Sequence, residues 1–284
     1  MHTRAALTLI IIAIGVAAWT SVLQGSVGDV LHAYALNVGQ GDAIYIRTEQ
    51  GIDVLIDGGP GGRVIPELAR AMPPGDKHID VMILTHPHYD HSSGLERVLN
   101  EYEVATIYIP SGMPKGEVAD MFLKVAQQEV AEVRTLDAGD RIVFDVNTHL
   151  DVFLPVDASF LYTTDNPNEW SVVAKLIHKD ASLLLTGDME RREELLLLRS
   201  DADVSSDALK VAHHGSAYAS IVGLLDRIRP DIAFVSVGKN TYGHPNPDTI
   251  GRLTRAGATV LRTDEEGTIH LVSDGVQFRV EPSE

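Results

Sequence analysis

Apolar and polar residues alternate along this chain with two different periods. Short runs rich in Val, Ile and Leu that stop at glycine, proline or histidine, such as Asp53–Ile56 and Val81–Leu84, predict β-strands. Stretches with apolar residues three and four positions apart, such as Val64–Ala71 and Pro247–Ala256, predict amphipathic helices. On this basis we expect about a dozen strands and roughly five or six helices. The other expected strands are Ala33–Val38, Ala43–Arg47, Val104–Ile109, Ile142–Val146, Leu150–Leu154, Ser171–Ile177, Ser182–Leu185, Leu209–Ala212, Ile232–Val237, Val260–Arg262, Thr268–Val272 and Val276–Val280, and the other expected helices are Glu117–Glu129, Glu190–Leu198 and Ala219–Ile228.

The order of these elements predicts an α/β architecture. Hairpin-like pairs of strands are mixed with strand–helix–strand crossings, which is typical of a mixed sheet system covered by helices. Met113–Gly116 and Tyr162–Asn168 are the expected loops, and neither has the composition of an interdomain linker. We therefore expect residues 28–282 to form one domain.

The first 25 residues have a different pattern. Ala5–Leu23 is almost purely apolar and follows the basic residue Arg4. A run with apolar residues on every face and a length close to the ~20 residues of a membrane span predicts a signal peptide or signal anchor, and a buried core helix is the alternative. Arg4 on the cytoplasmic side would place the rest of the chain outside the membrane, so we expect a secreted, periplasmic or outward-facing anchored protein.

Charge and cysteine content exclude several classes. The 284 residues include 23 Lys and Arg against 40 Asp and Glu, a formal net charge of −17. Such an acidic chain is not a protein that coats nucleic acid by bulk charge, although an enzyme can still act on nucleic acid through local contacts. The chain has no Cys, which excludes disulfides, thiolate zinc sites and Cys nucleophiles.

A histidine-rich motif follows the strand predicted at Val81–Leu84. It has the pattern H-x-H-x-D-H and contains His86, His88, Asp90 and His91. Four ligand side chains this close in sequence cannot all face one ion, but they can serve two ions, with His86 and His88 on one and Asp90 and His91 on the other. Imidazole and carboxylate are ligands that suit zinc. A polar loop that is His-rich by chance is the alternative.

Two later strand ends carry further candidate ligands. Thr186-Gly187-Asp188 places a carboxylate after an apolar strand, where Asp188 could bridge two cations. Leu209–Ala212 ends at His213 and His214, and neighbouring residues at a strand end point in different directions. One of this pair is expected to face the metals, and the sequence does not distinguish which one.

Other polar residues near these motifs are candidates for supporting roles. His244 could bind an oxyanion or protonate a leaving group. Asp57 is expected to accept hydrogen bonds that orient the metal loop, with a turn carboxylate that caps its own backbone as the alternative. Lys210 and Ser216 are assigned to substrate binding, and Lys210 and Lys239 are candidate phosphate contacts, although surface lysines are commonly only solvated.

In combination these motifs resemble the metallo-β-lactamase superfamily and, more narrowly, the C-terminal domain of the ComEC competence proteins. The resemblance covers about residues 30–272 and implies a four-layer αββα sandwich with a two-metal site at one edge of its two sheets. It also implies hydrolysis and, in the ComEC group, a nuclease that acts on incoming DNA. The matching segments are Leu36–Ala43, Leu55–Gly59, His86–His91, Leu184–Asp188, Leu209–Ser216, Tyr242–Pro245 and Arg262–Asp264.

The chain departs from the superfamily pattern in two ways. Members often have another metal-binding His before the T-G-D strand, where this chain has Asn168-Glu169-Trp170-Ser171. Asn168 could support the first metal site as a weaker ligand or leave that position to water, and His178 is expected to be structural. The large multi-spanning channel of ComEC is absent, so the resemblance concerns the catalytic domain and not DNA transport.

Together these observations predict an exported, metal-dependent hydrolase. Two divalent ions, with zinc expected and manganese as the alternative, would activate a bridging hydroxide that Asp90 orients, and His244 would stabilise charge or move a proton. The expected substrate is a phosphodiester, including DNA, and the membrane is a partner if the N-terminal segment stays uncleaved. An esterase, lactonase or cell-wall phosphodiesterase is a second reading, and a non-catalytic binding module on the membrane surface is a third. No protein partner is inferred.

Overall fold

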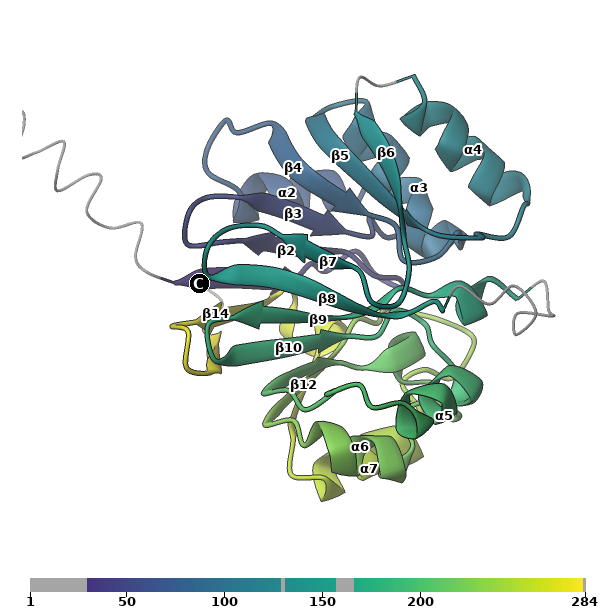
Figure 1. The fold of residues 1–284 in the computed structure, drawn as a ribbon, viewed down its shortest axis with the longest axis vertical. Coiled ribbons are helices and arrows are strands. Elements are labelled where there is room, and N and C mark those ends of the chain that lie inside the picture. Colours follow the sequence, from purple (N-terminus) through teal and green to yellow (C-terminus); the bar gives the residue numbers. More distant parts are fainter. Residues whose placement is uncertain (1–29, 129–130, 157–165, 283–284) are drawn as a thin grey trace, which may run out of the picture.

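Two β-sheets face each other, and helices cover the outer face of each (Figure 1). The computed structural model describes residues 30–128, 131–156 and 166–282. The segment at 1–25, predicted to be a signal peptide or anchor, lies outside these residues, as does most of the loop predicted at Tyr162–Asn168. Within the described ranges, no helix has the length and apolar character needed to cross a membrane.

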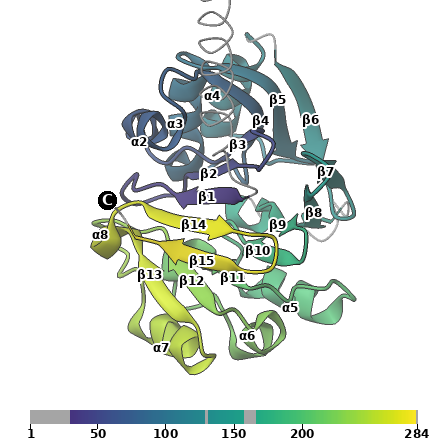
Figure 2. The same cartoon turned by 90° about the vertical axis from the view of Figure 1, so that its left-hand side faces the viewer.

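The first sheet has eight strands in the order β15-β14-β1-β2-β3-β4-β5-β6. Strands β3 to β6 are parallel to one another, and the other neighbours pair antiparallel. Figure 2 shows β14 lying beside β1, with β15 on the other side of β14. The bounds are β1 Leu31–Ala35, β2 Ile44–Arg47, β3 Asp53–Ile56, β4 His78–Ile83, β5 Glu103–Pro110, β6 Glu132–Leu136, β14 Ile269–Ser273 and β15 Phe278–Glu281.

The second sheet has seven strands in the order β13-β12-β11-β10-β9-β8-β7. Strands β10 to β13 are parallel, whereas β7, β8, β9 and β10 form successive antiparallel pairs. These pairs include the two hairpins predicted from the sequence. The bounds are β7 Arg141–Val143, β8 Thr148–Leu154, β9 Val173–His178, β10 Ala181–Leu185, β11 Ala208–Lys210, β12 Ile232–Val235 and β13 Thr259–Arg262.

Three layers of apolar side chains hold the sheets and helices together. In β10, Leu183 and Leu185 point into the core between the sheets, whereas Leu184 points to the opposite face, as the alternation of side chains along a strand requires. The outer layers contain Leu95 and Phe122 over the first sheet and Leu224 over the second. The expected four-layer αββα sandwich is therefore confirmed.

Six longer helices form the two outer layers. Helices α2 (Val64–Ala71), α3 (Tyr89–Leu99) and α4 (Glu117–Ala126) cover the first sheet. Helices α5 (Arg191–Arg199), α6 (Val222–Ile228) and α7 (Pro247–Arg255) cover the second sheet. Three single-turn helices, η1 (Pro167–Trp170), η2 (Ala212–Gly215) and α8 (Thr263–Glu266), complete the described elements.

The start of α3 is brought against the end of β3 by a close approach of two backbones. An added Cβ at Gly94 in α3 would lie 1.8 Å from the carbonyl oxygen of Gly58, so only glycine fits there. His91 in the first turn of α3 lies next to this contact, because the backbone N–H of Gly58 donates to the His91 carbonyl at 2.8 Å. The packing of α3 therefore fixes the place of the H-x-H-x-D-H motif.

Candidate metal centre

The predicted ligand motifs meet at one edge of the sandwich. His86 follows the carboxyl end of β4, Asp188 follows β10, and the His213-His214 pair follows β11. Because β10 and β11 run parallel, their following loops emerge at the same edge, where open α/β sheets commonly bind ligands. A pocket of about 460 Å³ opens there, lined by Gln40, His88, Asp90, Asp188, His213, His214, Tyr242 and His244.

Asp188 is the centre of this cluster. Its Oδ2 atom faces the Nε2 atoms of four imidazoles, at 3.3 Å from His214, 3.4 Å from His91, 3.9 Å from His213 and 4.0 Å from His86. Side chains from both sheets thus converge on one carboxylate oxygen, which is the position expected of a residue that bridges two cations.

Several polar atoms in the cluster are buried without a hydrogen bond. They are Nε2 of His91, Nε2 of His214 and Oδ1 of Asp188. Buried polar atoms are normally paired, so a group of unpaired ones calls for a ligand that is not a protein atom. Among the described residues, four groups have ligand atoms within 4.8 Å of one another, and two of them combine the predicted ligands, His86 with His91 and Asp188, and Asp90 with His91 and His214. The donor atoms are imidazole nitrogens and carboxylate oxygens, which fit zinc or manganese.

Hydrogen bonds behind the cluster orient the imidazoles of the first motif. Nδ1 of His91 lies 2.7 Å from Oδ2 of Asp57, and the hydroxyl of Thr85 donates to the same oxygen at 2.6 Å. The Thr85 hydroxyl is in turn 3.1 Å from Nδ1 of His86. Asp57 is buried and therefore fixes both rings through one carboxylate, with their Nε2 atoms left to face Asp188.

His213 and His214 have different surroundings although they are neighbours. His214 is buried, with Nδ1 2.8 Å from the Ser236 carbonyl oxygen and Nε2 3.5 Å from Oδ2 of Asp90. His213 is partly exposed, and its Nδ1 faces Glu190 at 3.6 Å. Both have left-handed backbone, with φ of 48° and 51°, which is costly for residues other than glycine and is common at functional sites. The geometry favours His214 as the ligand and leaves His213 on the pocket wall.

Opposite charges in the cluster shift one another's protonation. Burial raises the pKa of Asp188, but the adjacent His214 and His91 rings outweigh burial and hold this pKa well below its usual value. Burial lowers the pKa of His91 and of His214, but nearby carboxylates outweigh this effect. Asp188 and Asp57 raise the pKa of His91, and Asp188 and Asp42 raise the pKa of His214, both well above the ordinary histidine value. Protons on these two rings therefore balance the buried carboxylates, and a bound cation would replace them.

Lys210 lies beneath the pocket and not in it. Side chains alternate along β11, so Lys210 points to the inner face together with Ala208, where it is buried. Its ammonium group forms a short ion pair with Asp42, donates to the Gly187 carbonyl at 2.8 Å and lies 3.6 Å from Oδ1 of Asp188. This placement differs from the phosphate contact expected from the sequence, because no part of Lys210 lines the pocket.

The remaining candidates for substrate contact lie at different depths. His244 is half-buried, lines the pocket, and has a buried Nδ1 atom without a hydrogen bond. Burial, and then the charge of His213, lower the His244 pKa. Asn240 holds the loop around it by donating to the Gly238 and His244 carbonyls at 2.8 and 2.7 Å. Ser216 is buried and does not line the pocket, whereas Lys239 is exposed beside this loop.

The region that lacks the additional histidine is filled by two polar residues. Asn168 is buried and donates to Glu190 at 2.8 Å, and its own Oδ1 atom has no hydrogen-bond partner. The Ser171 hydroxyl accepts from the Asp188 backbone at 3.0 Å and lies 3.4 Å from Nδ1 of His86. His178 is remote from the cluster and contacts Ser273 at 2.9 Å.

Sequence reasoning missed Asp42, Ser171, Glu190 and Gln40 as members of this site. Asp42 is buried next to the cluster, with Oδ1 3.5 Å from Nδ1 of His214, and the Lys210 charge offsets its burial to lower its pKa to about 2. The Gly39-Gln40-Gly41 turn before it was a visible signal, because such a turn can bring a carboxylate close to a neighbouring backbone.

Comparisons with known proteins agree with this geometry. The family model of the metallo-beta-lactamase superfamily matches residues 36–239. ComE operon protein 3 of Bacillus subtilis is 30% identical over 256 residues, which cover 82% of this chain and 32% of the relative. Competence protein ComA of Neisseria gonorrhoeae is 27% identical over 243 residues, which cover 82% of this chain and 31% of the relative. The chain therefore spans about a third of the length of these curated relatives.

A solved structure shares the fold at much lower sequence identity. CmlA, a diiron β-hydroxylase from Streptomyces venezuelae, aligns with a TM-score of 0.57 and 13% identity over 90% of this chain and 54% of that protein. Such a likeness shows the fold alone, because one fold can carry several chemistries. The family match extends over most of the described sequence and includes the ligand motifs from His86 to His214. The chain therefore belongs to the metallo-β-lactamase superfamily, as a metal-dependent hydrolase with homologues among competence proteins.

Proposed function

We propose that this protein is a phosphodiesterase that cleaves nucleic acid with two divalent metal ions. The observation that carries the proposal is that the Nε2 atoms of His91 and His214 are buried without a hydrogen bond and face the same oxygen of Asp188, a residue that lines an open pocket. When bound, two such ions supply a Lewis acid for the phosphoryl oxygens and lower the pKa of coordinated water. His86, His88, Asp90, His91, Asp188 and His214 are the residues proposed to hold them.

The other pocket residues would handle the substrate. Asp90 lies at the boundary between the ligand cluster and the pocket, where it can orient the attacking water. His213 and His244 lie side by side, with ring centroids 5.4 Å apart, on the pocket wall. The lowered pKa of His244 favours the neutral ring near pH 7, so that it can accept a proton as a general base or donate an N–H hydrogen bond to a phosphoryl oxygen.

The exposed aromatic side chains favour nucleic acid over a small ester. Among the described residues, the aromatic side chains that are more than half exposed are Tyr89 (61%), Tyr218 (75%) and Tyr242 (74%). Tyr89 lies between two pocket residues in sequence, Tyr218 follows the His213-His214 motif, and Tyr242 lines the pocket itself. Exposed aromatic rings beside a phosphodiester site are suited to stack unpaired bases, which needs no large basic surface.

The experiment is a substrate screen on protein reconstituted with zinc or manganese. We expect turnover of a single-stranded oligonucleotide and of bis-p-nitrophenyl phosphate, and none of nitrocefin. Asp188→Asn, checked for folding by circular dichroism, is the inactive control. Cleavage of a lactone or carboxylic ester with inert phosphodiesters would replace the nuclease proposal by the esterase or lactonase reading. Two bound metals with no turnover of any substrate would favour a binding module.

We also propose that the domain works outside the cytoplasm. The support is the apolar stretch Ala5–Leu23 after Arg4, which has the composition of an export signal. Fusion of alkaline phosphatase after residue 28 should give an active fusion, and deletion of residues 2–25 should abolish that activity. An inactive fusion of the full leader would refute the location.

A further inference from the structure

Lys210 is a fully buried cation in contact with a candidate metal ligand. Its relative exposure is 0%, which for a lysine requires close charge partners. Asp42 and Asp188 are those partners, and the Gly187 carbonyl accepts a further hydrogen bond from the ammonium group. These contacts make the ammonium group a buried charge that is paired on more than one side.

The two oxygens of Asp188 face different cations. Oδ2 points to the imidazole Nε2 atoms, at 3.3 Å from His214 and 3.4 Å from His91. Oδ1 is the oxygen nearest to Lys210, at 3.6 Å from the ammonium nitrogen. The lysine thus lies on the side of Asp188 that is turned away from the ligand nitrogens, so that a single oxygen is left for bridging.

Asp42 connects the lysine to the ligand cluster. One of its oxygens pairs with Lys210, and the other lies 3.5 Å from Nδ1 of His214. Asp42, Asp57 and Asp188 are all buried in this region, and Lys210 is the cation among them that does not act as a metal ligand. Without any counter-charge, three buried carboxylates would repel one another strongly.

We propose that Lys210 is a positioning residue that sets the strength of metal binding. Its charge supports the carboxylates in the metal-free protein and keeps Oδ1 of Asp188 away from the metals, and it also lowers metal affinity through repulsion. The proposal rests on the proposed function only in assuming that divalent ions bind at Asp188. A superfamily site that contains a buried ammonium group would bind its metal ions less tightly than a site without one, and the protein would fold in the absence of these ions.

Two substitutions should change metal affinity in opposite directions. Lys210→Met removes a positive charge beside the site, so zinc affinity should rise at least about tenfold while the melting temperature in chelator falls. Asp42→Asn leaves the lysine charge uncompensated, so zinc affinity should fall at least about tenfold. Structural damage alone would weaken binding in both variants, and the opposite signs therefore identify the electrostatic role.

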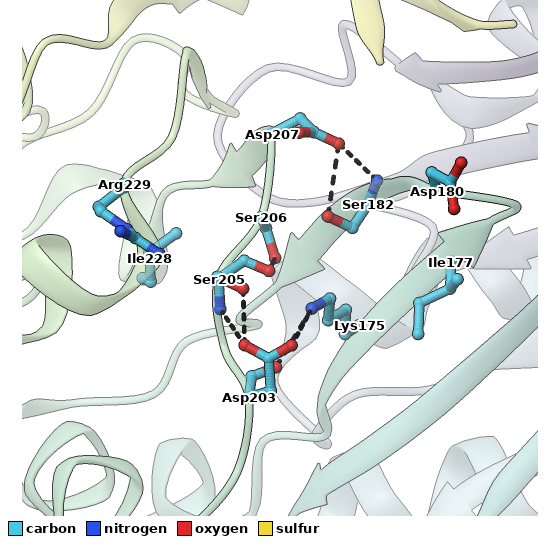
Figure 3. Close-up of a pocket in the computed structure, with 10 residues that line it drawn as sticks. All are labelled: Lys175, Ile177, Asp180, Ser182, Asp203, Ser205, Ser206, Asp207, Ile228 and Arg229. Carbon is cyan, nitrogen blue, oxygen red and sulfur yellow. Dashed lines mark hydrogen bonds and ion pairs between the residues drawn. The ribbon is translucent and has the colours of Figure 1, made fainter. Parts of the chain in front are cut away.

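The matched control is the buried lysine of another pocket. Lys175 is 7% exposed, and its ammonium group lies 3.1 Å from Asp203 in the pocket of Figure 3, whose lining contains none of the ligand motifs. Lys175→Met should lower the melting temperature by a similar amount with chelator and with zinc, and should leave zinc affinity within about twofold of the parent.

The measurement is competition for zinc with a chromophoric chelator, together with melting curves in zinc and in chelator. Zinc binding by Lys210→Met that is no tighter than in the parent would overturn the proposal. If this variant fails to fold, Lys210→Gln, which removes the charge but keeps a polar side chain, takes its place, and zinc binding no tighter than in the parent again overturns the proposal. These readouts do not depend on turnover, so a parent that binds zinc but cleaves no phosphodiester would refute the proposed function and leave this inference standing.

Discussion

Two polar hollows lie near opposite ends of β10 and β11. Polar atoms are hydrogen-bonded to one another in the first, whereas several buried polar atoms have no hydrogen-bond partner in the second. In the hollow of Figure 3, Asp207 accepts from the Ser182 backbone at 2.7 Å and the Lys175 ammonium reaches Asp203 at 3.1 Å. In the metal centre at the other end, His91 and His214 keep buried nitrogen atoms without a partner. The same two strands therefore support a closed polar network at one end and an open one at the other.

This difference distinguishes polar side chains that stabilise the fold from polar side chains that are available to a ligand. An unpaired buried polar atom costs folding free energy, on the order of 1–3 kcal/mol, which a paired atom does not. Stability alone would favour pairing at both ends. The metal edge is therefore the place where this cost is offset by a bound ligand, whereas the hollow around Asp207 is explained by packing and hydrogen bonding alone.

The largest expected effect is at the bridging carboxylate. Asp188→Asn removes the oxygen shared by the ligand nitrogens, so kcat/KM should fall by about 10³-fold or more and zinc binding should be lost. Steady-state kinetics and metal analysis by mass spectrometry measure both losses. If the variant is active and binds two ions, the conclusion that Asp188 and its neighbours form the ligand site is wrong.

The next largest expected effect is the dependence of zinc affinity on pH at the metal centre. His91 and His214 have pKa values raised well above the ordinary value, so both are protonated in the metal-free protein near pH 7. Zinc must displace these protons, and its affinity should rise with pH by up to about 100-fold per unit. Calorimetry in buffers of different ionisation enthalpy should detect up to about two released protons. A pH-independent affinity would contradict this.

Glu193 tests whether every unpaired buried atom marks a ligand site. Its Oε1 atom is buried without a hydrogen bond in α5, and burial raises its pKa to about 7. A raised pKa means that the folded protein holds this proton, so the contribution to stability is full below about pH 4.5 and is lost as pH rises through about 7. Glu193→Gln should therefore be about 3 kcal/mol more stable than the parent at pH 8 and equal to it near pH 4.5, by urea unfolding.

A substitution in the hollow of Figure 3 should change the stability of the protein and not its catalytic activity. Asp207→Asn weakens the acceptor for the Ser182 backbone, so the free energy of unfolding should fall by about 1–2 kcal/mol. Its kcat/KM should stay within about twofold of the parent, because Asp207 lies at the other end of β11 from the ligands. A large loss of activity at normal stability would mean that the two ends are coupled.

The smallest expected effect is at the rim of the pocket. Tyr242→Ala should raise KM for a single-stranded oligonucleotide by about fivefold and leave kcat unchanged, because a stacked ring contributes to binding and not to the reaction. An abasic oligomer of equal length is the control and should show no difference between the parent and the variant. An equal loss on both substrates would argue against stacking.

The pattern of apolar residues predicted most of the elements but missed one strand, one of the longer helices and the three single-turn helices. Asp53–Ile56 and Val64–Ala71 have the predicted bounds, because each is a clear periodic run between turn residues. Helix α3 was missed because its first turn is the polar ligand motif around Asp90 and His91. Strand β6 was missed because Glu132–Leu136 is mostly exposed and lies at a sheet edge, where little apolar character is required.

The metal centre was predictable where its residues belong to short motifs that follow predicted strands, as Asp188 and His214 also do. His86 and His91 belong to one motif and could be found from spacing. Asp42 could not, because its role arises from a contact with Lys210 that depends on how the two sheets pack. The direction of the Lys210 side chain was accessible in principle from strand alternation, but only once the inner face of β11 was known.

The return of the last two strands to the first sheet has a consequence for synthesis. Strand β14 pairs with β1, and Ile269 and Phe278 complete the core between the sheets. A chain synthesised only as far as β13 lacks both strands, so the edge of β1 is unpaired and this part of the core is incomplete until residues 269–281 have been added. The core between the sheets is therefore completed only after all the strands that lead to the ligand motifs have been made.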